Sequence, residues 1–184
     1  MTTEIQQFKS RLLELFRTQA LTRGDFTLSS GKKSTYYLDG RIITLSAEGA
    51  YLIGRIILDM IKDEDIDAIG GPTIGADPIV GAIAAVSFIQ KQPIKTFIVR
   101  KAPKPHGQRR QIEGPAIKEG AKVIVVDDVA TTGKSFVEAI SVLRNEGFKV
   151  DTAITIVDRD EGAKEALAKV SCKLLSIFSH EDFK

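Results

Sequence analysis

Cysteine and tryptophan are scarce in this sequence: Cys172 is its only cysteine and tryptophan is absent. One cysteine excludes an internal disulfide framework and predicts a protein of the reducing cytoplasm. No apolar run approaches the roughly 18 residues that a membrane-spanning helix needs. The 26 Lys and Arg nearly balance the 24 Asp and Glu, so bulk charge does not indicate nucleic acid binding. Aromatic residues make up only 7%, which argues against a stacking surface for RNA.

The length of 184 residues fits one medium α/β domain. Apolar spacing predicts helices at 4–20, 46–62, 79–89, 135–145 and 161–169, a hairpin at 26–41, and strands at 66–70, 94–99, 122–126, 150–157 and 174–178. The strands Val123–Val126 and Ile154–Val157 are continuous apolar runs, which are typical of strands covered on both faces. The pattern therefore predicts a central, mostly parallel sheet flanked by helices.

Ligands of such sheets bind at the carboxyl ends of the strands. One of these ends is Val123–Ser135, VIVVDDVATTGKS: a buried strand, two carboxylates, a short loop and the start of a helix. The hydroxyls and backbone N–H groups of Thr131–Ser135 suit a phosphate at the positive end of the helix dipole. Asp127 and Asp128, expected just beyond the strand, suit a pair of ribose hydroxyls or metal-bound water.

Two alternatives were weighed for this segment. An N-capped helix preceded by surface acids leaves unexplained why two mutually repelling carboxylates end a buried strand. A nucleotide triphosphatase is suggested by GKS, but the Walker A motif needs a glycine five residues before Gly133, where Asp128 stands. The second alternative therefore fails on spacing.

The segment resembles the signature of type I phosphoribosyltransferases, which bind 5-phosphoribosyl-1-diphosphate (PRPP). The resemblance implies that Asp127 and Asp128 contact the ribose hydroxyls and that Thr131–Ser135 holds the 5′-phosphate. The whole PRPP-binding run is then Asp127, Asp128, Val129, Ala130, Thr131, Thr132, Gly133, Lys134 and Ser135. The glycine-containing run Gly70–Asp77, GGPTIGAD, resembles the pyrophosphate loop of the family.

The lid segment, Arg100–Pro115, has the sequence RKAPKPHGQRRQIEGP and lacks apolar periodicity, as active-site lids often do. A solvated surface loop is the plain alternative. Its RKxxKxHG run resembles the mobile catalytic loop of orotate phosphoribosyltransferases. By that resemblance its basic residues contact the diphosphate and reach the neighbouring subunit of a homodimer; these residues are Arg100, Lys101, Lys104 and His106.

The N-terminal part also resembles orotate phosphoribosyltransferases. Residues 1–45 would contribute to a small N-terminal hood that covers the base, within one domain spanning 1–184. Some family members carry a substrate-contacting lysine where this chain has Ser29. In TIVDRDEG, Arg159 follows a strand, and an arginine fork suits the carboxylate that distinguishes orotate from uracil. The resemblance places Thr131 and Arg159 on orotate; a surface pair of Arg159 with Asp158 or Glu161 is the alternative.

Together these resemblances imply an orotate phosphoribosyltransferase that makes orotidine 5′-monophosphate and pyrophosphate in pyrimidine biosynthesis. Lys104, His106 and Asp128 are the expected catalytic residues. Mg²⁺ is the expected cofactor, held mainly by PRPP rather than bound directly by the protein. Another nucleobase as acceptor and a non-catalytic PRPP-binding regulator remain alternatives. No nucleic acid or membrane partner is expected.

Overall fold

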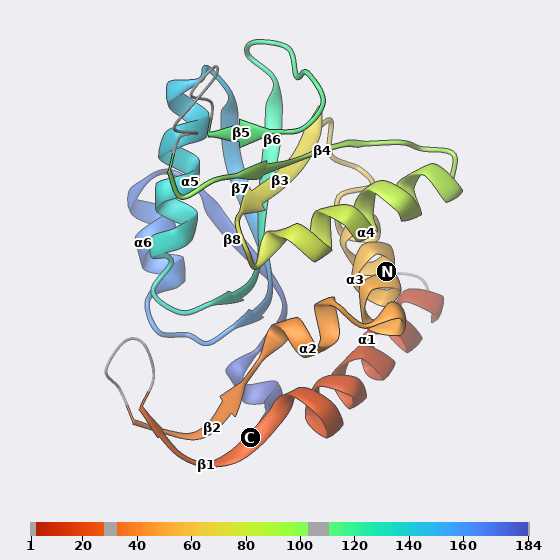
Figure 1. The fold of residues 1–184 in the computed structure, drawn as a ribbon, viewed down its shortest axis with the longest axis vertical. Coiled ribbons are helices and arrows are strands. Elements are labelled where there is room, and N and C mark those ends of the chain that lie inside the picture. The colour runs from red at the N-terminus through yellow and green to blue at the C-terminus, as the bar shows by residue number, and fades with distance from the viewer. Residues whose placement is uncertain (1–2, 28–32, 103–110, 184) are drawn as a thin grey trace.

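A six-stranded sheet forms the centre of the protein (Figure 1). The structure is a computed structural model and describes residues 3–27, 33–102 and 111–183. The strand order across the sheet is β5 (Ile112–Glu113), β4 (Lys95–Val99), β3 (Ala68–Pro72), β6 (Lys122–Ala130), β7 (Lys149–Asp158) and β8 (Lys173–Ser179). All neighbours pair in parallel except β4 and β5. The predicted mostly parallel sheet is confirmed.

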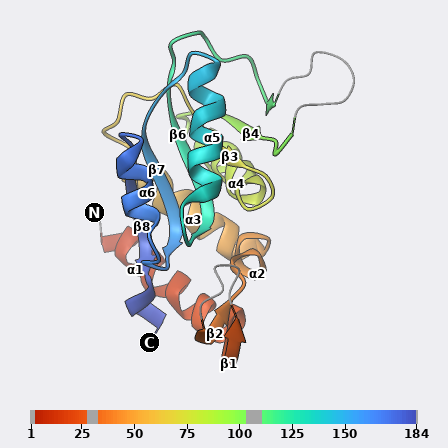
Figure 2. The same ribbon diagram turned by 90° about the vertical axis from the view of Figure 1, so that its left-hand side faces the viewer.

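Helices cover both faces of this sheet, as Figures 1 and 2 show from two sides. One face carries α3 (Ala47–Met60) and α4 (Ala76–Ile89), with α1 (Thr3–Leu15) packed against α3; the other carries α5 (Lys134–Asn145) and α6 (Ala163–Lys169). Alternate residues of β6 pack into two different hydrophobic cores. Ile124 and Val126 belong to one core, and Val123 and Val125 belong to the other. This period of two explains the continuous apolar run. No helix of the described ranges is long and apolar enough to cross a membrane.

The N-terminal residues form a separate two-stranded sheet. After α1, the chain continues through a π-helical turn, η1 (Phe16–Ala20), into the antiparallel strands β1 (Leu21–Thr27) and β2 (Lys33–Leu38). A short helix, α2 (Gly40–Thr44), leads from this hairpin back to α3. The Asp39 N–H donates to the Ala20 carbonyl at 3.1 Å, which closes the hairpin at its base. The hairpin therefore begins before the predicted residue 26, and the last two residues of the predicted range 26–41 belong to α2.

Pairing between strands makes β6 longer than predicted and adds a strand, β5, that the sequence did not predict. The sequence predicts that β6 ends at Val126, yet Val129 still pairs with Val157 of β7, and the strand continues to Ala130. The short strand β5 was not predicted, because its two residues are ordered only by pairing with Ile98 and Val99 of β4. Both differences lie at the carboxyl ends of the parallel strands.

An aromatic cluster joins the two ends of the described chain. Phe16 lies edge-to-face with Phe178 at 6.2 Å and with Phe183 at 6.0 Å between ring centroids. Phe183 belongs to the terminal 3₁₀ turn, η2 (His180–Phe183), and also meets Phe178 edge-to-face. All three rings are at least 95% buried. The cluster therefore fixes the N-terminal helical region against the last strand of the sheet.

We expect Phe16→Ala to lower the free energy of unfolding by about 3–5 kcal/mol, because it leaves a cavity between two other aromatic rings. Phe16→Leu, which keeps most of the volume, should cost clearly less. Urea unfolding followed by circular dichroism measures both. Equal unfolding midpoints for the wild type and Phe16→Ala would show that the cluster does not hold the two ends together.

Candidate active site

Two neighbouring acids lie inside the sheet near the end of β6. Asp127 is only 7% exposed and Asp128 is half-buried. The expectation that they follow the strand is therefore wrong: they belong to it, and β7 still pairs beyond them. Successive side chains of a strand start on opposite faces, but here both carboxylates reach Gly75, where an added Cβ would meet Oδ1 of each. Asp127 meets Ser135 of α5, whereas Asp128 lies against Gly40 of α2.

Local hydrogen bonds hold both carboxylates in place. Asp127 Oδ2 accepts a bond from Ser135 Oγ at 3.1 Å, and its Oδ1 accepts one from the Asp128 N–H at 3.0 Å. Asp128 Oδ1 accepts a bond from the Val129 N–H at 2.8 Å. Burial and the charge of Asp128 raise the pKa of Asp127 well above its ordinary value. Burial also raises the pKa of Asp128, while its backbone hydrogen bonds and nearby Arg41 oppose that shift.

The loop after β6 presents backbone N–H groups at the start of α5. Gly133 precedes this helix with φ +78°, and α5 has no side-chain N-cap hydrogen bond. A Cβ at Gly133 would lie 3.0 Å from Leu167 Cδ1 and 3.1 Å from Ala163 Cα. Glycine is thus needed both for the backbone conformation and for the close approach of α6. Open N–H groups at the positive end of a helix of this length suit a phosphate.

A glycine also brings the loop after β3 against the two acids. A Cβ on Gly75 would collide with Asp127 Oδ1 and would lie 2.6 Å from Asp128 Oδ1. At Gly71, a Cβ would overlap the carbonyl of Val126. Neither position can accept a side chain without a shift of its neighbours. The backbone of Gly70–Asp77 therefore approaches the carboxylate pair directly, and its role as a pyrophosphate loop stays a prediction.

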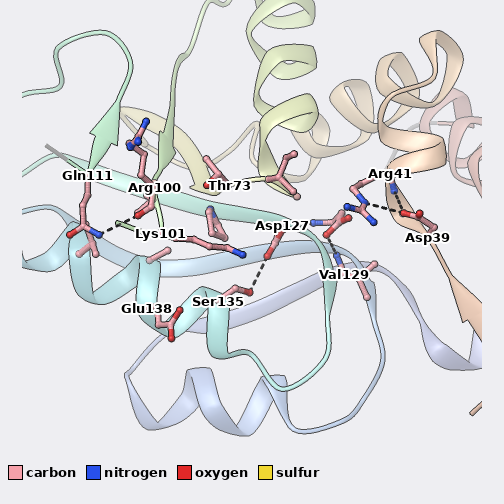
Figure 3. A pocket seen from close by; sticks show the side chains of 18 of the residues that line it. Asp39, Arg41, Thr73, Arg100, Lys101, Gln111, Asp127, Val129, Ser135 and Glu138 are labelled. Atoms are coloured by element: carbon pink, nitrogen blue, oxygen red, sulfur yellow. Dashed lines mark hydrogen bonds and ion pairs between the residues drawn. The ribbon is translucent and has the colours of Figure 1, made fainter. Parts of the chain in front are cut away.

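A cavity of about 660 Å³ opens over this edge of the sheet. Its charged and polar walls come from α2, from the loop after β3, from the end of β4, from β6 and from α5, as Figure 3 shows. Its charged lining residues are Asp39, Arg41, Arg100, Lys101, Asp127, Asp128 and Glu138. The cavity therefore brings the two acids of β6 together with one cation from α2 and two cations that follow β4.

The first residues of the lid segment belong to this cavity. Arg100 follows β4; its N–H donates to the Gln111 carbonyl at 2.8 Å, and its guanidinium lies 3.7 Å from Glu113 Oε1. Lys101 is exposed and lines the cavity beside Arg100. The strand β5 brings the far end of the segment back to β4. Lys104 and His106 lie outside the described residues.

Arg159 lies immediately after β7 and is buried. Its N–H donates to the Ala130 carbonyl at 2.9 Å, and its Nε donates to Glu161 Oε1 at 2.9 Å. The guanidinium carbon stands 5.1 Å from the centre of the Tyr36 ring of β2. The side chain is 8% exposed, so its pair with Glu161 is not a solvated surface pair. Neither Arg159 nor Thr131, both within the described chain, lines the cavity over the acids.

A lysine that no sequence motif indicated, Lys164, pairs with the acidic residues on both sides of Arg159. Lys164 Nζ lies 3.0 Å from Asp158 Oδ2 and 3.0 Å from Asp160 Oδ1. Asp158 is fully buried, and the Asp160 N–H donates to its Oδ1 at 2.9 Å. His180 Nδ1 meets Asp160 at 2.8 Å from the C-terminal turn. These contacts fix the backbone on both sides of Arg159.

The sequence also did not single out Asp39 and Arg41, which form one wall of the cavity. Asp39 is the N-cap of α2, and its Oδ1 accepts a hydrogen bond from the Arg41 N–H at 3.1 Å. An aspartate before a helical turn is a recognisable capping signal. Nothing in the local pattern, however, places Arg41 beside Asp128, because that proximity depends on the fold.

Comparisons with known proteins agree with this arrangement. Residues 43–184 match the family model described as phosphoribosyl transferase domain. The chain is 44% identical to an orotate phosphoribosyltransferase of Synechocystis sp. over 183 residues, covering 100% of the chain and 92% of that relative. It is also 44% identical to that of Aquifex aeolicus, covering 92% of the chain and 94% of the relative.

Solved structures are similar over nearly the whole chain as well. A crystal structure of Mycobacterium tuberculosis orotate phosphoribosyltransferase with Fe(III) dicitrate has a TM-score of 0.84 at 38% identity, covering 96% of this chain and 98% of that one. The same enzyme in complex with PRPP has a TM-score of 0.80 at 35% identity, with the same coverage. An adenine phosphoribosyltransferase of Leishmania tarentolae, 15% identical with a TM-score of 0.68, covers 94% of this chain and 89% of its own and shares the fold.

We expect Asp128→Asn to lower the pKa of Asp127, because it removes the neighbouring negative charge that raises it after burial. Burial will still keep that pKa above the ordinary value of an aspartate. Carbon-13 NMR titration of the side-chain carboxyls measures the shift. Asp151→Asn, at an exposed position of β7, is the matched control and should leave Asp127 unchanged. An identical Asp127 titration in wild type and Asp128→Asn would contradict the electrostatic coupling.

Proposed function

The chain belongs to the orotate phosphoribosyltransferase family, and from that premise we propose that it transfers the 5-phosphoribosyl group of PRPP to orotate. The products are orotidine 5′-monophosphate and pyrophosphate, a step of pyrimidine biosynthesis. The observation that carries the proposal is the buried pair Asp127–Asp128 beside the open N-terminus of α5. The pair suits two ribose hydroxyls, and the helix start suits the 5′-phosphate at the other end of the same sugar.

The sugar phosphate is proposed to bind along β6 and the loop that follows it. The backbone N–H groups and hydroxyls of Thr131–Ser135 hold the 5′-phosphate. Asp127 and Asp128 accept hydrogen bonds from the ribose hydroxyls, and these donors also relieve the repulsion between the two acids. With both ends of the sugar held, C1 is fixed for an in-line exchange of its substituents, and positioning is a large part of the catalysis.

Orotate is proposed to bind on the side of the sugar that faces the hood, near Thr131 and Arg159. The guanidinium of Arg159 is oriented by Glu161 and by the ring of Tyr36, which supports a role in recognising a planar carboxylate. The N–H of Arg159 is bonded to Ala130, directly before Thr131. The proposed base contacts are therefore anchored to the strand that carries the ribose acids. The hood itself, formed within residues 1–45, is proposed to cover the base.

The reaction breaks the bond between C1 and the diphosphate oxygen as the orotate nitrogen forms its bond to C1. The hydrogen on that nitrogen leaves as a proton, which the departing pyrophosphate can take up. Positive charge develops on the ribose ring, and negative charge develops on the departing pyrophosphate. Arg100 and Lys101 line the cavity where that charge appears. Lys104 and His106 are proposed to complete this group, on the resemblance of the lid segment alone. Preorganised cations at the developing charge lower the barrier, and a closed lid excludes water, which would otherwise capture C1.

We propose Mg²⁺ as the cofactor, carried mainly by the diphosphate and the ribose hydroxyls of PRPP. Two adjacent buried carboxylates fit a cation nearby, and Asp127 and Asp128 would contact its water shell. The described residues hold no group of three or more acidic, histidine or cysteine side chains suited to a metal ion. When bound, the ion neutralises charge on the diphosphate.

A homodimer is proposed, with the lid segment of each subunit reaching the site of the other. The lid resemblance supports the exchange. Large apolar side chains left exposed on neighbouring helices and on the loop after β3 support an interface: Ile42, Leu45, Tyr51, Ile74, Phe88 and Ile89. These helices, α2, α3 and α4, pack one against the next. Exposed apolar side chains on adjoining helices support a surface that binds another protein.

The proposed location is the cytoplasm. Cys172 is free and buried in the described chain, and burial raises the pKa of its thiol to about 11. A thiol held in this protonated form behaves as a small apolar side chain rather than as a disulfide partner. The sequence has no second cysteine for an internal disulfide, and this composition supports a protein that works where thiols stay reduced.

We expect the protein to consume orotate when it is mixed with PRPP and Mg²⁺, with one pyrophosphate released for each orotate lost. Orotate absorbance follows the base, and a coupled pyrophosphate assay follows the other product. Uracil, hypoxanthine, adenine and xanthine are the competing acceptors and should react far more slowly. Rapid conversion of one of these without loss of orotate would overturn the base assignment, and PRPP binding without any conversion would favour a regulator.

Heterodimers will test the proposed exchange of lid segments. Lys104→Ala and Asp127→Asn should each abolish most activity, because each removes a group that acts on the same PRPP. A mixed dimer of the two variants contains one site with both groups intact, so we expect recovery of activity. Co-expression with two affinity tags isolates that dimer. Mixed dimers as inactive as their parents would place Lys104 in the site of its own subunit.

A further inference from the structure

Arg41 extends from the first turn of α2 into the cavity over the acids, as Figure 3 shows. Asp39 fixes it in two ways: Oδ1 accepts hydrogen bonds from the Arg41 N–H and from the Arg41 Nε, both at 3.1 Å. One carboxylate oxygen thus holds the main chain and the side chain of the same arginine. The guanidinium is restrained at its Nε end, and its two terminal nitrogens point away from that restraint.

These terminal nitrogens have no hydrogen-bond or ion-pair partner among residues 3–27, 33–102 and 111–183. The side chain is 47% exposed and opens onto the cavity. Its positive charge acts on Asp128, where it opposes the rise in pKa that burial causes. The guanidinium of Arg41 therefore presents two oriented terminal nitrogens as hydrogen-bond donors at the border of the proposed ribose site.

The other walls of the cavity indicate which part of the substrate this donor pair meets. The same space is lined by Thr73, Ile74 and Gly75 of the proposed pyrophosphate loop and by Arg100 and Lys101 at the base of the lid segment. Thr131 and Arg159, the proposed orotate contacts, do not line it. Arg41 thus shares its space with the groups proposed for the diphosphate and not with those proposed for the base.

The charges in the cavity support the same assignment. Its described acids, Asp39, Asp127, Asp128 and Glu138, repel a polyanion. Arg100 and Lys101 lie on one side of Asp127. Arg41 lies on the other side, next to the hood (Figure 3). The loop Gly70–Asp77 between these two groups contains no lysine or arginine. A diphosphate held against that loop needs a cation on the side where Arg41 stands.

We propose that Arg41 is a further substrate-binding residue, which donates hydrogen bonds to the diphosphate of PRPP from the side opposite Arg100 and Lys101. This inference rests on the proposed function and extends it by one residue. Asp39 is the positioning residue that sets the guanidinium. Capping of α2 does not require the arginine side chain, because the cap uses the main-chain N–H that any residue except proline would supply.

The test measures binding of Mg²⁺–PRPP and Mg²⁺–pyrophosphate by titration calorimetry, together with steady-state kinetics in both directions. We expect Arg41→Gln to weaken both ligands roughly tenfold or more, the loss of about one charge-assisted hydrogen bond. The KM for orotate should change little. Arg41→Lys should recover part of the affinity, and Asp39→Asn, which keeps a cap, should weaken both ligands less than Arg41→Gln. Arg23→Gln removes the same charge from an exposed position of the hairpin and should leave all these values unchanged.

Unchanged affinity for both diphosphate ligands in Arg41→Gln, with an unfolding midpoint like that of wild type, would overturn the proposal. A rise in the KM for orotate without weaker pyrophosphate binding would also overturn it, since Arg41 would then serve the base. The calorimetric titration needs no base acceptor. A wild-type protein that does not use orotate would therefore contradict the proposed function while still leaving the role of Arg41 measurable.

Discussion

The repulsion between two neighbouring carboxylates in a buried strand is the constraint around which this structure is arranged. Burial disfavours the charged form of Asp127, and Asp128 beside it adds to that cost. The surrounding groups limit this cost: Ser135 donates to one acid, and backbone N–H groups donate to both. A site that retains such a cost is typical of ligand binding, because the ligand supplies the donors or cations that the protein lacks.

The fold places the remaining parts of the site by the geometry of the parallel sheet. The carboxyl ends of β3, β4, β6 and β7 meet at one edge, so their loops converge although they are distant in sequence. Glycines at positions 71 and 75 let the loop after β3 approach the acids, and Gly133 lets the loop after β6 pack against α6. The hairpin and α2 then close the edge from the N-terminal side, as Figure 1 shows.

The apolar runs of β6 and β7 were enough to predict the parallel sheet, because a strand covered on both faces carries apolar residues at consecutive positions. The motif from Asp127 to Ser135 was also recognisable, since its chemistry is local. The end of β6 was misplaced because polar residues usually end a buried strand, whereas here the acids remain in the sheet and point into a cavity. Pairing with β7 extends β6 to Ala130, and no local pattern in the sequence reveals that pairing.

Long-range proximity accounts for the other features that the sequence did not predict. Arg41 borders Asp128, Tyr36 stacks on Arg159, and Lys164 joins Asp158 to Asp160. The first two of these contacts join the N-terminal hairpin region to strands of the main sheet. Arginine and lysine at such positions look like ordinary surface residues until the chain is folded.

The alternation of side chains along β6 has a mechanical consequence. Asp127 contacts Ser135 of α5 and Asp128 lies against Gly40 of α2, although both carboxylates line the same cavity. In the proposed complex, a sugar that bonds to both acids therefore also links α5 to α2. The bound substrate becomes a structural component of the enzyme, and its binding free energy adds to the stability of the folded state.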